Sequence, residues 1–116
     1  MGETIIEKII RHNTGKAVKP GDIVTVNVDR VMIHDIFIPF VADKFEEMGF
    51  TKLHDPDKVV LIYDHLVPAS QQDDTRHFRT GDAFAEKYGL THVHRSDGIC
   101  HQLMTEAGYV KPGNIV

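Results

Sequence analysis

The stretch that decides the fold is KVVLIYDHLVPAS, residues 58–70. It begins with an unbroken apolar run from Val59 to Tyr63, and such runs are typical of strands that are buried on both faces of a parallel sheet. A carboxylate and an imidazole, Asp64 and His65, follow directly. Pro68 disfavours any further strand, because proline lacks the backbone N–H that a sheet requires. The stretch therefore predicts a central strand that ends in two titratable side chains.

Segments on both sides of this strand alternate between strand and helix patterns. Apolar residues at helical spacing predict helices, and glycines close most of these segments. Short apolar or alternating runs predict further strands. Strands separated by helices imply crossover connections, so we predict an α/β fold in which helices flank a mainly parallel sheet in three layers. The predicted helices are 4–14, 35–49, 75–89 and 98–108, and the predicted strands are 23–28 (which the run at 31–33 continues or follows), 58–64 and 90–94.

The composition fits one folded domain over residues 1–116, with 41% hydrophobic and 26% charged residues. No apolar run approaches the roughly 18 residues of a membrane-spanning helix. The net charge is −4 and the 13 basic residues are scattered, which argues against nucleic acid as a partner. The single cysteine cannot form an internal disulfide, and this fits a reducing compartment. We therefore expect a cytoplasmic protein that binds neither nucleic acid nor a membrane.

Histidine is abundant, with eight residues, and three of them follow predicted strands. His34 comes after the run at 31–33, His65 follows the central strand, and His101 lies just beyond the strand predicted at 90–94. The carboxyl ends of parallel strands meet at one edge of an open sheet, where ligands bind. An imidazole beside a carboxylate holds and delivers a proton near neutral pH. The pattern predicts an acid–base site at this edge, and two such groups on opposite sides of a substrate could carry out an elimination.

Structural interpretations compete with each of these assignments. An isolated Asp-His pair is common on surfaces, and Asp35 is a good N-cap for the helix that follows it. His92 and His94 share one face of a strand, but without a third ligand at useful spacing they predict no metal site. Cys100 is expected to be a small buried hydrophobe, and Gln102 is equally suited to substrate binding or to hydrogen bonding within its loop. We expect three histidines in polar surroundings to be solvated: His12, His54 and His77.

Three stretches carry a resemblance to a known family. They are VKPGDIVTVNVDRVMIHD (18–35), DPDKVVLIYDHLVP (55–68) and YGLTHVHRSDGICHQLMTEAGYVKPGNIV (88–116). In this order and at these separations they resemble the N-terminal part of 3-isopropylmalate dehydratase large subunits, within the aconitase superfamily that also contains homoaconitase and aconitase. The resemblance extends from about residue 4 to residue 116, and residues 70–80 match poorly.

The resemblance implies part of a hydro-lyase that removes water from a hydroxy di- or tricarboxylate and returns it in the other orientation. In that family a [4Fe-4S] cluster acts as a Lewis acid on the substrate hydroxyl. Carried over to this sequence, Asp64 and His65 would protonate the leaving hydroxyl, and His101 would be a second imidazole of the proton network. His34 would bind substrate, and the histidine there favours the isopropylmalate branch, which belongs to leucine biosynthesis. Asp35 lies in a matched segment and receives no chemical role.

The resemblance also implies that important parts lie elsewhere. The family's three cluster cysteines have no counterpart here, and Cys100 stands where relatives carry an apolar residue. Residues 1–116 are therefore expected to be a single N-terminal α/β domain of a larger subunit, inactive alone and binding no cluster alone. The cluster would belong to the full-length enzyme, and the partners would be the remaining domains and a separate small subunit.

Three alternatives stay open at the level of sequence. The substrate could be that of homoaconitase or aconitase. The chain could instead be a complete small protein that binds a metabolite, or serves as an interaction module, without catalysis. A third alternative is a metalloprotein that uses His34, His65 and His101.

Overall fold

The computed structural model describes residues 2–116, and a sheet of parallel strands forms its centre. The strands are β1 (Val31–His34), β2 (Val59–Ile62) and β3 (His92–His94), in the spatial order β1-β2-β3. All four residues of β2 are buried, as the continuous apolar run predicts. The register pairs His34 with Ile62 and Ile62 with His94. The carboxyl ends of the three strands are therefore level at one edge.

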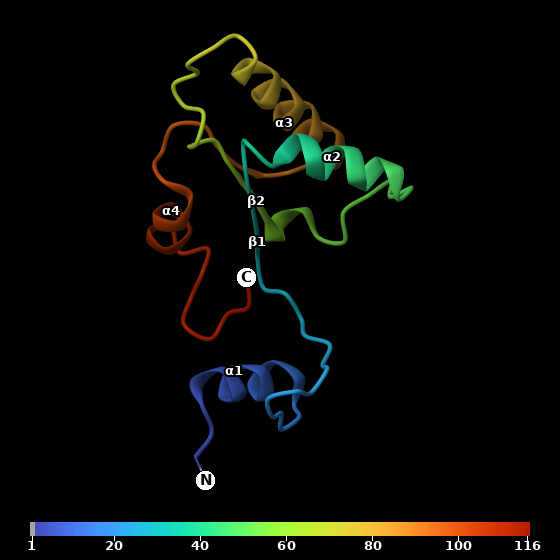
Figure 1. Ribbon diagram of the computed structural model, residues 1–116, viewed down its shortest axis with the longest axis vertical. Coiled ribbons are helices and arrows are strands. Elements are labelled where there is room, and N and C mark those ends of the chain that lie inside the picture. Colours follow the sequence, from blue (N-terminus) through green and yellow to red (C-terminus); the bar gives the residue numbers. More distant parts are fainter. Residues whose placement is uncertain (1) are drawn as a thin grey trace.

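Helices cover both faces of the sheet (Figure 1). On one face α2 (Ile38–Glu47) and α3 (Asp74–Tyr88) pack against Leu61 and Tyr63. On the other face α4 (Cys100–Glu106) packs against Val60 and Ile62. Neighbouring residues of a strand point to opposite faces, so β2 supplies both cores. The three-layer α/β/α arrangement predicted from the sequence is confirmed.

The helix predicted at 4–14 forms as α1 (Ile5–Thr14), and a glycine closes it as predicted. Thr4 and Glu7 make a reciprocal capping box, and Gly15 ends the helix in the left-handed conformation at φ 73°. α1 lies apart from the sheet, at the opposite end of a molecule 56 Å long from α2 and α3 (Figure 1). Its apolar stripe is largely exposed, because Ile5 and Ile6 contact no core.

The prediction of a strand at residues 23–28 is wrong. These residues pair with no strand within the described part of the chain, and Ile23 is fully exposed. Asn27 instead exchanges hydrogen bonds with the side chain of Asn13, which attaches the extended segment to α1. Alternating polarity indicates an extended chain with two unlike faces, but it does not specify a partner strand.

The remaining elements form close to their predicted positions, with shorter bounds. The predicted helix 35–49 begins only at Ile38, because residues 35–37 form a turn, and Pro39 lies in its first turn as expected. The predicted helix 98–108 is the shorter α4, and a short 3₁₀ helix (Pro56–Lys58) precedes β2. Among the residues described, no helix combines the length and the apolar character that crossing a membrane requires.

Candidate active site

The carboxyl edge of the sheet brings three of the predicted site residues together. His34 is the last residue of β1, and Asp64 and His65 follow β2 closely. The imidazole rings of His34 and His65 stack, with centroids 3.9 Å apart and planes inclined by 17°. Asp64 Oδ1 lies 2.5 Å from Nδ1 of His65. Parallel pairing of β1 with β2 creates this cluster, because it makes the two strands end side by side.

The side chain of Asp64 is nearly buried, and its two carboxylate oxygens bond to different parts of the chain. Its Oδ2 accepts a hydrogen bond of 2.6 Å from the backbone N–H of Cys100, at the start of α4. Burial raises the pKa of Asp64, but the hydrogen bonds from Cys100 and His65 outweigh it, so the pKa lies below its ordinary value. An ionised Asp64 favours the tautomer in which His65 donates from Nδ1. Nε2 of His65 has no hydrogen-bond partner among residues 2–116 and is available to a substrate.

His34 is mostly buried under His65. Burial lowers its pKa, and the charge of His65 lowers it further, against the attraction of Asp35 and Asp64. Its Nδ1 is buried and finds no hydrogen-bond partner within the described chain. The structure therefore favours the neutral form of His34.

Asp35 is a member of this site that the sequence analysis did not assign. Its side chain is completely buried, and its Oδ1 lies 3.9 Å from Nδ1 of His34 and 3.8 Å from Nδ1 of His65. The alternative in which Asp35 caps the following helix is wrong, since α2 has Phe37 at its N-cap and no side-chain cap bond. The available signal was its position, immediately after a strand at the sheet edge where ligands bind.

His101 lies at the rim of the site. It is exposed on the first turn of α4, and it is near enough for its charge to lower the pKa of His34 slightly. No hydrogen bond joins it to the other site residues in the part of the chain described. Gln102, next to it, donates to Glu106 on the same helix at 2.6 Å, which favours the structural interpretation of that side chain.

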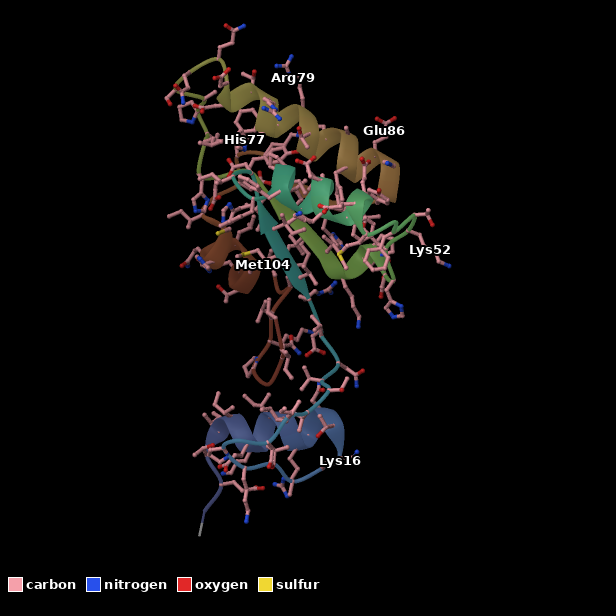
Figure 2. All side chains as sticks on the ribbon, turned by 45° about the vertical axis from the view of Figure 1, so that its right-hand side comes forward. Lys16, Lys52, His77, Arg79, Glu86 and Met104 are labelled. Carbon is pink, nitrogen blue, oxygen red and sulfur yellow. The ribbon has the colours of Figure 1, made fainter. Side chains whose placement is uncertain are left out.

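Cys100 and His77 also lie near this edge, and the sequence analysis made a prediction for each. Cys100 is fully buried against β2, as predicted for a small hydrophobe. His77 was expected to be solvated, and this is wrong: it is half-buried on α3, and its Nδ1 lies 3.1 Å from the backbone oxygen of Asp35. Figure 2 shows His77 near the end of the molecule far from Lys16. The polar neighbours of His77 in the sequence gave no sign of a partner 42 residues away.

A second histidine cluster lies on the α4 face of the sheet. His94 is bonded through both ring nitrogens, with Nδ1 2.7 Å from Asp97 and Nε2 2.8 Å from the hydroxyl of Tyr109. Nδ1 of His92 lies 3.4 Å from the same hydroxyl. His92 and His94 therefore share one face, as predicted, but they meet a tyrosine.

Two sets of side chains place potential metal ligands within 4.8 Å of one another: His34, Asp35 and His65, and Asp64, His65 and Cys100. The ring geometry opposes a metal in the first set. An imidazole binds a metal close to its own plane, and the rings of His34 and His65 are stacked with their planes inclined by only 17°, so they do not direct their nitrogens at one ion. In the second set, burial raises the pKa of the Cys100 thiol, and Asp64 raises it further, which opposes the thiolate form that metals require. The arrangement is better suited to holding a proton.

The comparison with known proteins identifies the family of this chain. The profile of the Aconitase family (aconitate hydratase) matches residues 5–116. The chain belongs to the aconitase family. Similar curated proteins include 3-isopropylmalate dehydratase large subunits from Moorella thermoacetica (40% identical) and Methanoregula boonei (37%), and large subunit 1 from Methanopyrus kandleri (38%). Each match covers 100% of this chain and 28% of the relative.

The donor set of this chain does not fit the iron–sulfur cluster that the family resemblance implies. Such clusters are held by several cysteine thiolates, and the sequence contains one cysteine. That residue, Cys100, is fully buried among Val60, Ile62 and Met104, and burial raises the pKa of its thiol. What this chain contributes to chemistry is therefore its carboxylates and imidazoles.

Proposed function

We propose that this chain forms the proton-donating wall of a hydro-lyase active site. The parent protein would remove water from a hydroxy di- or tricarboxylate and return it, as a 3-isopropylmalate dehydratase does. The observation that carries the proposal is the pair of Asp64 and His65, 2.5 Å apart, at the edge where β1 and β2 end. Membership of the aconitase family and the printed names of the relatives support this reaction class.

The side chains suit the departure of a hydroxyl group. Asp64 remains ionised and bonds to Nδ1–H of His65, so the imidazolium donates its second proton from Nε2 to the leaving oxygen as the C–O bond breaks. A base from outside this chain would take the proton of the neighbouring carbon, the electrons of that C–H bond would form the C=C bond, and water is released. In the reverse direction neutral Nε2 takes a proton from the incoming water. His34 supplies a neutral surface that contacts the substrate and orients His65, and His101 would exchange protons at the rim. Such general acid catalysis is worth roughly 10²–10⁴ in rate.

The other half of the site would come from outside this chain. No arginine or lysine of residues 2–116 bonds to His34, Asp64 or His65, and carboxylate substrates need cationic partners. We infer that the remaining domains of a large subunit and a small subunit supply these cations and the [4Fe-4S] cluster. On this proposal residues 1–116 are the N-terminal domain of that subunit, and alone they bind no cluster and are inactive. The single cysteine is consistent with a cytoplasmic parent.

A chimera tests the proposal. The matching segment of the Moorella thermoacetica large subunit is replaced by this chain, and the protein is assembled with its own small subunit and reconstituted with iron and sulfide under anaerobic conditions. We expect dehydration of 3-isopropylmalate, and His65→Ala should lower kcat by about 10²-fold or more. His12→Ala, an exposed histidine on α1, is the matched control and should leave kcat unchanged.

Two results would count against this function. Full activity of the His65→Ala chimera would remove the proton donor from the mechanism. A chimera that folds and carries its cluster, yet acts on citrate or homocitrate and not on 3-isopropylmalate, would move the assignment to the aconitase or homoaconitase branch. Calorimetry on the chain alone separates the remaining alternative, because a metabolite-binding module would bind 3-isopropylmalate without a cluster.

A further inference from the structure

Asp35 is a buried ionisable group to which the proposed function gives no part. Its side chain is completely buried, yet no lysine or arginine within residues 2–116 pairs with it. A carboxylate in such a place is costly unless hydrogen bonds replace the water that it has lost. The hydrogen bonds of Asp35 therefore indicate its structural role.

Every polar group of Asp35 is engaged, and most bonds reach distant parts of the chain. Its backbone N–H donates to the Ile62 carbonyl at 3.1 Å, which extends the pairing of β1 with β2. Oδ1 accepts from the N–H groups of Ile36 (3.1 Å) and His65 (3.2 Å), and Oδ2 accepts from the N–H of Leu66 (2.8 Å). The carboxylate thus joins the end of β1 to the loop that follows β2, 30 and 31 residues further along the chain.

We propose that Asp35 is a positioning residue that holds the His65 ring over His34 by fixing the backbone of residues 65 and 66. The two backbone N–H bonds set the direction in which the His65 side chain leaves the loop. From there its ring stacks on His34, and its Nδ1 reaches Asp64. Without these two hydrogen bonds the loop can move, the His65 ring can leave the stack, and the direction of its Nε2 is no longer fixed.

A second buried carboxylate shows what a purely local role looks like. Asp74 is also almost fully buried and accepts bonds from the backbone N–H groups of Ser70 (2.8 Å) and Gln71 (3.1 Å). Those partners are three and four residues away, so Asp74 shapes only its own loop. Asp74→Asn is therefore a matched control for Asp35→Asn: both replace a buried acceptor of backbone bonds by an isosteric amide.

Imidazole NMR on the chain itself tests the positioning. In the wild type, long-range ¹H–¹⁵N spectra should show one fixed tautomer for His65, and nuclear Overhauser effects should join the His34 and His65 rings. We expect Asp35→Asn to abolish both signals and Asp74→Asn to leave both unchanged. The groups that face His34 are Asp35, Asp64, His65 and His101. Since the Asp35 charge raises the pKa of His34, its removal should also lower the titration midpoint of His34 further.

An Asp35→Asn chain that keeps the ring–ring contacts, the fixed tautomer and the wild-type titration overturns the proposal. If Asp35→Asn does not fold, Asp35→Glu keeps the charge but displaces it, and it should lose the same signals. Wild-type hydrogen exchange is an independent check: the amides of His65 and Leu66 should be protected relative to that of Val67, and equal exchange at all three positions would overturn the proposal.

The effect on turnover rests on the proposed function and is measured separately. In the chimera, Asp35→Asn should lower kcat about tenfold or more and change KM by less than about twofold, because a misdirected proton donor affects the transition state more than substrate binding. Asp74→Asn should change neither. If His65→Ala is active, the proposed function fails while the NMR result still stands. If His65→Ala is inactive and Asp35→Asn is fully active, the positioning role fails.

Discussion

The two histidine clusters of this chain differ in how many ring nitrogens the protein uses. In the cluster on the α4 face, both nitrogens of His94 are bonded, one to Asp97 and one to Tyr109. In the cluster at the carboxyl edge, His65 bonds only through Nδ1, to Asp64, and Nε2 has no partner in the described chain. A histidine with one anchored and one free nitrogen can transfer a proton, and one with both nitrogens occupied serves to hold structure.

The two clusters also connect different parts of the fold. Tyr109 follows α4, and its backbone oxygen accepts from Arg30, just before β1, at 3.2 Å. The His94 cluster therefore ties the segment after α4 to the sheet. The His65 cluster instead joins the end of β1 to the loop that follows β2, because Asp35 accepts from the backbone N–H of His65 at 3.2 Å. Similar carboxylate–imidazole pairs thus differ in what lies on the far side of the ring: the Tyr109 hydroxyl for His94, and no partner within residues 2–116 for His65.

The largest expected difference between the clusters concerns catalysis. In the chimera, Asp64→Asn should lower kcat by about 10²-fold or more, because the amide no longer stabilises the His65 imidazolium. Asp97→Asn removes the corresponding carboxylate from His94 and should leave kcat within about twofold, since both nitrogens of that ring are bonded within the chain. Steady-state kinetics on both variants checks this. Equal losses of kcat would erase the distinction between the clusters.

A smaller effect is expected on stability. Tyr109→Phe removes the hydroxyl that bonds to Nε2 of His94 at 2.8 Å and leaves that nitrogen without its hydrogen-bond partner. The free energy of unfolding should fall by about 1 kcal/mol, and kcat of the chimera should not change. Urea unfolding of the chain measures the first quantity. A chain as stable as the wild type would mean that this cluster does not hold the segment after α4.

The smallest effect is a shift of one titration. Burial, and then the charge of His65, lower the pKa of His34, while His101 adds a weaker contribution in the same direction. His101→Ala should therefore raise the pKa of His34 slightly, leaving it below the ordinary value of 6.5 because burial remains. ¹H NMR titration of the His34 ring measures the shift, and His12→Ala is the control. An unchanged midpoint would place His101 outside the electrostatic reach of the stack.

The same lowered pKa has a consequence for stability. Because His34 binds its proton less tightly in the folded than in the unfolded chain, its neutral form stabilises the fold above about pH 6.5. This contribution is lost as the pH falls through the folded-state pKa of His34. The lowered pKa of His34 therefore disfavours a state in which the His34 and His65 rings are both protonated.

The sequence by itself determined the elements whose signal is local. The apolar run of β2, the helical spacing in α2 and α3, and the capping box of α1 depend on residues that are near neighbours along the chain. The same reasoning placed His34, Asp64 and His65 at one edge, because parallel strands end together. The resemblance of the quoted stretches to the aconitase superfamily was likewise a property of sequence alone, and the family match confirms it.

Only the tertiary structure decided which long-range partners these residues meet. Alternating polarity over 23–28 indicated a strand, but no strand of the described chain pairs with it. Asp35 looked like a helix cap and His77 like a solvated side chain, yet Asp35 bonds to residues 65 and 66, and His77 bonds to Asp35. A buried polar group is satisfied by whichever donor the fold brings near it, and sequence distance carries no information about that donor.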